Sequence, residues 1–86
     1  MYEELIEQVV VLDMATPYVI VGTLQQVSQS NLSLKDVDVH DLRDSTTTRE
    51  VYVREIRLHG VAANRKSAII RLDQIVSVSL LEDVLP

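Results

Sequence analysis

Short aliphatic runs separated by polar turns divide the chain into five predicted strands. These runs are rich in Val and Ile, whose branched side chains fit the pleated surface of a sheet better than a helix. A turn ending at Pro17 separates the first two strands, and a tight link at residues 73–74 joins the last two. The predicted strands are residues 8–12, Tyr18–Val27, 31–40, 67–72 and Ile75–Leu80.

Two of these strands have the pattern of a strongly bent sheet. In Tyr18–Val27, apolar residues occupy both alternation sets, and Gly22 lies near the middle. In 31–40, the apolar positions change face at residues 35–36, which predicts a bend or bulge there. Long strands that are covered on both sides and relaxed by a glycine are typical of small barrels. The predicted fold is therefore mostly β, a small barrel of five strongly bent strands.

Two further segments are predicted to be helical. Residues 1–8 begin with acidic side chains, which stabilise a helix N-terminus, and carry apolar residues at helical spacing. A helix over 45–58 is predicted between the third and fourth strands, beginning at the hydroxyl residues 45–46 and ending at Gly60. Valines at alternating positions within this segment also fit a strand, which is the alternative.

The composition fits one small folded domain over residues 1–86. Apolar residues make up 47% of the chain and cysteine is absent, so the core is aliphatic and no disulfide supports it. A domain this small buries only about 60% of the surface that its unfolded chain exposes, so we expect assembly with other copies. No aliphatic run approaches the ~20 residues that span a bilayer. We expect a cytoplasmic protein without a signal peptide or membrane partner.

The net charge of −5 is unevenly distributed, because most of the acidic residues precede residue 49. The basic residues gather at Arg49, Arg54, Arg57, Arg65 and Lys66. The last two fall in a predicted loop over 61–66. A basic patch of this kind either contacts phosphate groups or is a solvated helix face with Glu–Arg pairs, and both interpretations stay open.

Signals of catalysis are missing. The sequence has no cysteine nucleophile, no Gly-x-Ser-x-Gly elbow and no glycine-rich phosphate loop, so we predict no enzyme and no cofactor. Acidic residues and one histidine alternate near the end of the third strand, where they could hold a divalent cation. They are Asp36, Asp38, His40, Asp41 and Asp44. The same pattern is explained by a polar strand end facing water, or by acids that pair with the arginines of a neighbouring copy, and we predict no metal.

Two short motifs stand out within the strands. In the first, Ile20-Val21-Gly22-Thr23-Leu24 is followed, a few residues later, by Asn31-Leu32-Ser33-Leu34. In the second, Ile70-Arg71-Leu72-Asp73-Gln74 leads into Ile75-Val76-Ser77-Val78. Both motifs and the order of the elements resemble the Sm-like (LSm) family, which includes the bacterial RNA chaperone Hfq. At the positions where the family has an Asp, an aromatic or His, and a Gly, this chain has Ser28, Ser30 and Leu72.

The resemblance implies an Sm-like barrel, related to SH3-like barrels, with a short N-terminal helix and an inserted helix between strands 3 and 4. It also implies a single-stranded RNA site on the inner rim of a homo-oligomeric ring of about five to seven copies. The implied RNA-binding residues are Asn31, Arg71 and Asp73. The implied contacts between copies involve Ala68, Ile69, Ile70, Ile75, Val76 and Val78.

Two alternatives stay open beside this hypothesis. Asn31 could instead cap a turn, while Arg71 pairs with an acid such as Asp73 at the surface. The chain could also form a structural or protein-interaction ring that has lost the RNA pocket. In that case the inserted helix over 45–58 and the exposed apolar tail residues Leu81, Val84 and Leu85 would be docking elements. The serines at 28 and 30 favour this second function, whereas Arg71 and the basic stretch favour RNA.

Overall fold

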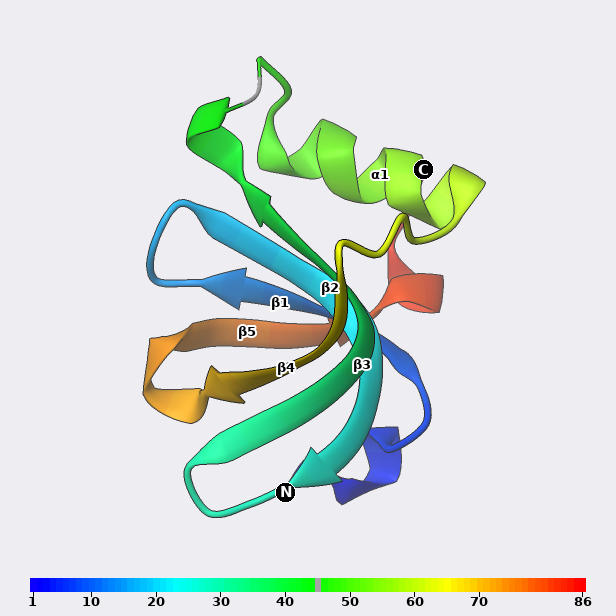
Figure 1. The fold of residues 1–86 in the computed structure, drawn as a ribbon. Helices are drawn as coiled ribbons and strands as arrows, with labels where there is room; N and C mark the ends of the chain where they lie inside the picture. The colour runs from blue at the N-terminus through cyan, green and yellow to red at the C-terminus, as the bar shows by residue number, and fades with distance from the viewer. Residues whose placement is uncertain (45) are drawn as a thin grey trace.

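The computed structural model describes residues 1–44 and 46–86. Its centre is a five-stranded antiparallel sheet in the order β4-β3-β2-β1-β5, which curls strongly along its length (Figure 1). The strands are β1 (Val9–Met14), β2 (Tyr18–Val27), β3 (Asn31–Asp41), β4 (Arg65–Arg71) and β5 (Ile75–Leu80). The predicted mostly β fold with five bent strands is therefore confirmed.

The bend is made at Gly22 and Asp36, on neighbouring strands. A Cβ atom added to Gly22 would lie 3.2 Å from the carbonyl oxygen of Lys35, so the glycine lets the two backbones approach closely. The β2–β3 register shifts at this level, and Asp36 has a φ of 50°. A residue in the left-handed region turns a bulged strand and increases its twist. The change of face predicted at residues 35–36 is confirmed.

The bend leaves the sheet with two apolar clusters. The inner cluster consists of Val10, Leu12, Met14, Ile20, Leu24, Leu32, Leu34, Val37 and Ile70. The outer cluster consists of Val11, Val19 and Val21 from the sheet and Val53 and Ile56 from the helix α1 (Arg49–His59). The side chains of successive residues in β1 and β2 thus pack in different clusters, which explains why both alternation sets are apolar. Figure 1 shows α1 lying across one end of the sheet.

The helix α1 confirms the predicted insertion but begins later than predicted. Its N-cap is Thr48, whose Oγ1 accepts a hydrogen bond from the backbone N–H of Val51 at 3.3 Å. The start predicted at 45–46 is therefore wrong, and residue 45 itself lies outside the described residues. Gly60, with a φ of 89°, ends the helix as predicted.

The N-terminal segment is helical over fewer residues than the predicted 1–8. It makes only a 3-10 turn, η1 (Glu3–Leu5), after which Ile6 is extended and Glu7 has a φ of 73°. The backbone N–H of Glu7 donates to the carbonyl of Leu24 at 2.7 Å. This bond to β2 draws the chain into the sheet before the acidic and apolar pattern can continue as a helix.

Both ends of β4 also differ from prediction. The strand β4 begins at Arg65, so the predicted basic loop over 61–66 is shorter and its last two residues are in the sheet. Leu72, predicted as the end of a strand, begins the 3-10 turn η3 (Leu72–Gln74), which joins β4 to β5. Two further 3-10 turns are η2 (Leu42–Asp44) and η4 (Leu81–Asp83).

Candidate functional site

Two chain reversals meet at the end of the sheet that lies away from α1. They are the β2–β3 loop at residues 28–30 and the turn η3. The backbone N–H of Leu72 donates to the carbonyl of Ser30 at 2.9 Å, which ties the two reversals together. Asn31, the first residue of β3, is directly opposite Arg71, the last residue of β4. The structure therefore brings together the Asn and Arg that the two sequence motifs contributed separately.

The loop before Asn31 is closed by backbone groups and by Ser28. The backbone N–H of Ser28 donates to the carbonyl of Asn31 at 2.9 Å, and Ser28 Oγ accepts from the N–H of Asn31 at 3.1 Å. The side-chain amide of Asn31 makes no hydrogen bond within residues 1–44 and 46–86. The turn is thus closed without this amide, which stays available to a ligand.

Arg71 and Asp73 form an exposed ion pair beside this amide. Arg71 Nη2 donates to Asp73 Oδ2 at 2.6 Å, as the surface-pair alternative predicted. A hollow of about 450 Å³ opens between the β2–β3 loop and η3. Its lining residues are Gln29, Ser30, Asn31, Arg71, Leu72 and Asp73. This rim hollow offers two amides, a guanidinium and a carboxylate, but no aromatic ring.

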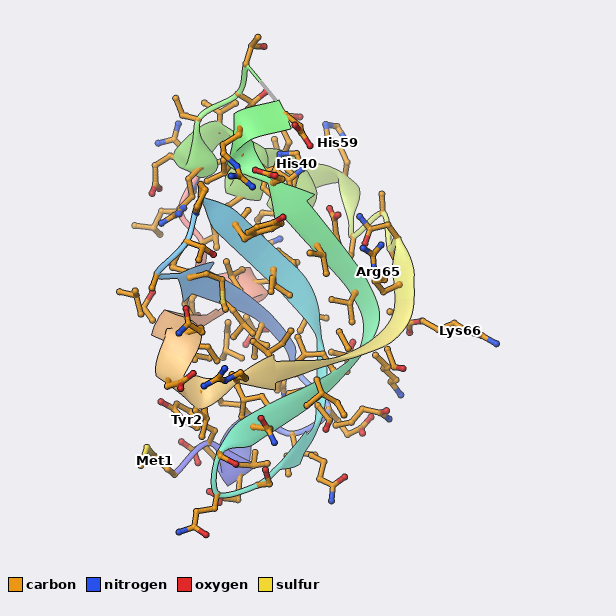
Figure 2. All side chains as sticks on the ribbon, turned by 60° about the vertical axis from the view of Figure 1, so that its left-hand side comes forward. Met1, Tyr2, His40, His59, Arg65 and Lys66 are labelled. Atoms are coloured by element: carbon orange, nitrogen blue, oxygen red, sulfur yellow. The ribbon has the colours of Figure 1, made fainter. Side chains whose placement is uncertain are left out.

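The basic residues lie on two separate elements. Arg54 and Arg57 are exposed on α1, where both line a hollow of about 370 Å³ against the C-terminal residues. Arg65 and Lys66 are exposed at the start of β4, and Figure 2 shows Lys66 extending away from the sheet. Arg49, the fifth residue of the basic stretch, lies 3.7 Å from the Asp13 carboxylate.

The alternating acidic residues near the end of β3 do not gather around a cation. Asp36 is exposed at the bulge, and the Asp41 carboxylate pairs with Arg43 at 2.8 Å. Asp38 is buried and accepts hydrogen bonds from the Tyr52 hydroxyl and from Asn64 Nδ2. Across the described part of the chain, no group of three or more His, Cys, Asp or Glu side chains is placed to hold a metal ion.

Sequence reasoning missed the polar network that joins α1 to β3. The Tyr52 ring stacks on His40 with centroids 3.9 Å apart, and its hydroxyl donates to the Asp38 carboxylate. Burial, together with the hydrogen bond to Asp38, raises the pKa of the Tyr52 hydroxyl well above its usual value. Asn64 also accepts from the backbone N–H of Val39 at 3.0 Å, so it joins the loop after α1 to the same network. No local pattern marks these residues, because their contacts depend on where α1 packs.

The two edge strands carry the residues that the resemblance assigned to contacts between copies. β4 and β5 are each paired on one side only. Ile69 and Val76 are exposed, with 72% and 71% of their surfaces accessible. The other four, Ala68, Ile70, Ile75 and Val78, belong to the inner cluster or pack against it. Of these six residues, only Ile69 and Val76 have exposed apolar side chains.

Comparison with known proteins identifies the fold. No protein-family model and no curated protein sequence matches this chain. Among solved structures, the chain is similar to an Sm protein of Pyrococcus abyssii in complex with a uridine heptamer, with a TM-score of 0.62 and 15% identity. The match covers 91% of this chain and 89% of that one. The fold is therefore Sm-like. No helix in the described residues is long and apolar enough to cross a membrane.

Proposed function

We propose that this chain is a ring-forming Sm-like protein that binds single-stranded RNA through Asn31, Arg71 and Asp73. The observation that carries the proposal is the pairing of Asn31 with Arg71 at an open hollow, where the Asn31 amide has no partner among the described residues. The solved Sm protein of similar fold is in complex with a uridine heptamer, which supports RNA as the ligand class.

The chemistry of the rim hollow suits an unpaired base and its phosphate. An amide carries both a donor and an acceptor, so Asn31 can match the adjacent donor and acceptor on the edge of uracil. The Arg71 guanidinium can stack on a base or bind a phosphate, and Asp73 holds it in position. The net charge of −5 opposes RNA at a distance, so affinity depends on these local contacts.

A ring would pair the two open edges of the sheet. Unpaired edge strands invite pairing with another chain, and β4 of one copy can pair with β5 of the next. Such head-to-tail contacts close into a ring when the rotation fits, and we propose about five to seven copies. Ile69 and Val76 would then be covered. Repetition of the rim hollow would add avidity for one RNA strand.

Fluorescence anisotropy with labelled oligo-U and oligo-A tests the RNA site. We expect the parent to prefer oligo-U and Arg71→Ala to weaken binding by about tenfold or more. Arg43→Ala is the matched control, because Arg43 is also an exposed arginine paired with an acid two residues away, at Asp41. Equal binding by the parent and Arg71→Ala, or no binding by the parent, would contradict the assignment. A monomeric mass at micromolar concentration in sedimentation equilibrium would contradict the ring.

A second candidate function is docking of a protein partner, favoured by the surface between α1 and the C-terminus. Val51, Leu58 and Leu85 are exposed there, and all three line the same hollow as Arg54 and Arg57. Exposed apolar side chains grouped in this way are typical of interaction surfaces. If neither oligonucleotide binds, this surface becomes the better candidate for the function of the ring.

A further inference from the structure

A second hollow adjoins the rim hollow and contains an aromatic ring. It has a volume of about 380 Å³ and is lined by Tyr2 and its neighbours in the N-terminal segment, together with the end of β2. Gln29 and Leu72 line both hollows, so the two are neighbours on the surface. Figure 2 shows Tyr2 next to the turn that joins β4 to β5. An aromatic side chain therefore lies beside the site whose own loop has only serines.

The position of Tyr2 is fixed by the fold. Its carbonyl accepts a hydrogen bond from the N–H of Leu5 at 3.0 Å, which closes the turn η1. The Glu7–Leu24 backbone bond then ties this turn to β2. The Tyr2 ring is partly buried and packs against the inner cluster. Such a ring loses little conformational freedom when a planar ligand covers its remaining surface.

We propose that Tyr2 is the stacking residue of this site, and that each copy binds two consecutive nucleotides of single-stranded RNA. One base would contact Asn31 and Arg71 in the rim hollow, and the next would stack on Tyr2. This inference rests on the proposed RNA-binding function. In this arrangement the stacking ring comes from the N-terminal turn and not from the β2–β3 loop, where Ser28 and Ser30 have no ring.

Each hollow is lined by one cation and one carboxylate that pair with each other. They are the N-terminal ammonium of Met1 with Glu3 in the hollow of Tyr2, and Arg71 with Asp73 in the rim hollow. The guanidinium of Arg71 has further donors beside the one that Asp73 accepts, so the backbone phosphate between the two nucleotides would lie toward Arg71, with a neutral base over Tyr2. Because every base has a flat π face, stacking on Tyr2 adds affinity without adding base selectivity.

Two substitutions at Tyr2 separate stacking from packing. Tyr2→Leu keeps an apolar side chain against the inner cluster but removes the ring, whereas Tyr2→Phe keeps the ring. We expect Tyr2→Leu to weaken oligo-U and oligo-A binding by a similar factor of about tenfold, and Tyr2→Phe to bind as the parent does. Tyr18→Leu is the matched control, because Tyr18 lies at the opposite end of β2 from the two hollows.

Photocross-linking gives a readout that does not depend on a variant folding. Oligo-U carrying 5-iodouridine should form an adduct on Tyr2 that mass spectrometry locates. Adducts that spare Tyr2, or equal affinity of Tyr2→Leu and the parent, would overturn this inference. If Arg71→Ala weakens binding in the same experiment, the proposed function stands while the role of Tyr2 falls. If the parent binds neither oligonucleotide, both fall together.

Discussion

Replacing Tyr52 with Phe tests the polar network between α1 and β3. The variant keeps the ring that stacks on His40 but removes the hydroxyl that donates to Asp38. Asp38 is only 8% exposed and keeps one side-chain donor, Asn64 Nδ2, at 3.2 Å. Loss of a hydrogen bond to a buried charged group costs about 2 kcal/mol. With a urea dependence of about 1 kcal/mol per molar for a small domain, the unfolding midpoint should fall by about 2 M.

The same variant should change how stability depends on alkaline pH. In the unfolded chain, a tyrosine hydroxyl loses its proton near pH 10, whereas burial beside Asp38 raises the pKa of Tyr52 in the folded protein. Its contribution to stability is therefore complete below pH 10 and is lost progressively as the pH rises above that value. The loss is at most about 1.4 kcal/mol per pH unit, and partial exposure of the ring reduces it. Tyr52→Phe should lack this part of the alkaline loss.

Urea unfolding at pH 7 and from pH 9 to 11, at one fixed protein concentration, measures both effects. Tyr2→Phe is the control, because the Tyr2 hydroxyl makes no hydrogen bond within residues 1–44 and 46–86. A Tyr52→Phe midpoint within a few tenths of a molar of the parent, with the same alkaline loss, would refute the reasoning. It would mean that the Tyr52–Asp38 contact contributes nothing to the attachment of α1.

Three further predictions concern the bend, an ion pair and the sheet edge. Gly22→Val should lower the unfolding free energy by about 1–3 kcal/mol in urea titrations, because the new side chain would crowd the Lys35 carbonyl oxygen 3.2 Å from its Cβ. The hydrogen bonds from Arg43 lower the pKa of Asp41 to about 2. Any stability from this pair is therefore present above the ordinary aspartate pKa and is lost as the pH falls through about 2. In Arg43→Ala, the Asp41 pKa should rise toward about 4, which NMR titration of the carboxyl group would measure. Ile69→Lys should lower the mass seen in sedimentation equilibrium, because it places a charge on an exposed strand edge, and an unchanged mass would argue against assembly through β4.

The strands were predictable because their apolar patterns are local and their branched side chains favour a sheet over a helix. The change of apolar face within 31–40 even located the bulge at Asp36. The early end of the N-terminal helix was not predictable, because the hydrogen bond from the Glu7 N–H to the Leu24 carbonyl outweighs a weak helical pattern. The start of α1 was misplaced because hydroxyl residues run continuously from 45 to 48, and each is a plausible cap.

The candidate site was predictable only in part. The two sequence motifs supplied Asn31 and Arg71, and their resemblance to a known family suggested that they meet. Tyr2 could not be assigned, because the sequence does not reveal that the N-terminal turn lies beside η3. Asp38 was expected on a solvated strand end, but α1 covers it and Tyr52 satisfies its carboxylate. Contacts between elements far apart in the chain account for both omissions.

The two clusters of the core differ in how much of their packing depends on α1. The inner cluster contains no residue of α1, and its packing comes from the sheet, the N-terminal turn and Leu72 of η3. The outer cluster takes Val53 and Ile56 from α1, so removal of the helix would leave Val11, Val19 and Val21 with less cover, from neighbours such as Leu81 and Val84. A form of this barrel with a short β3–β4 turn would therefore gain from polar residues at these three positions, whereas its inner cluster could stay unchanged.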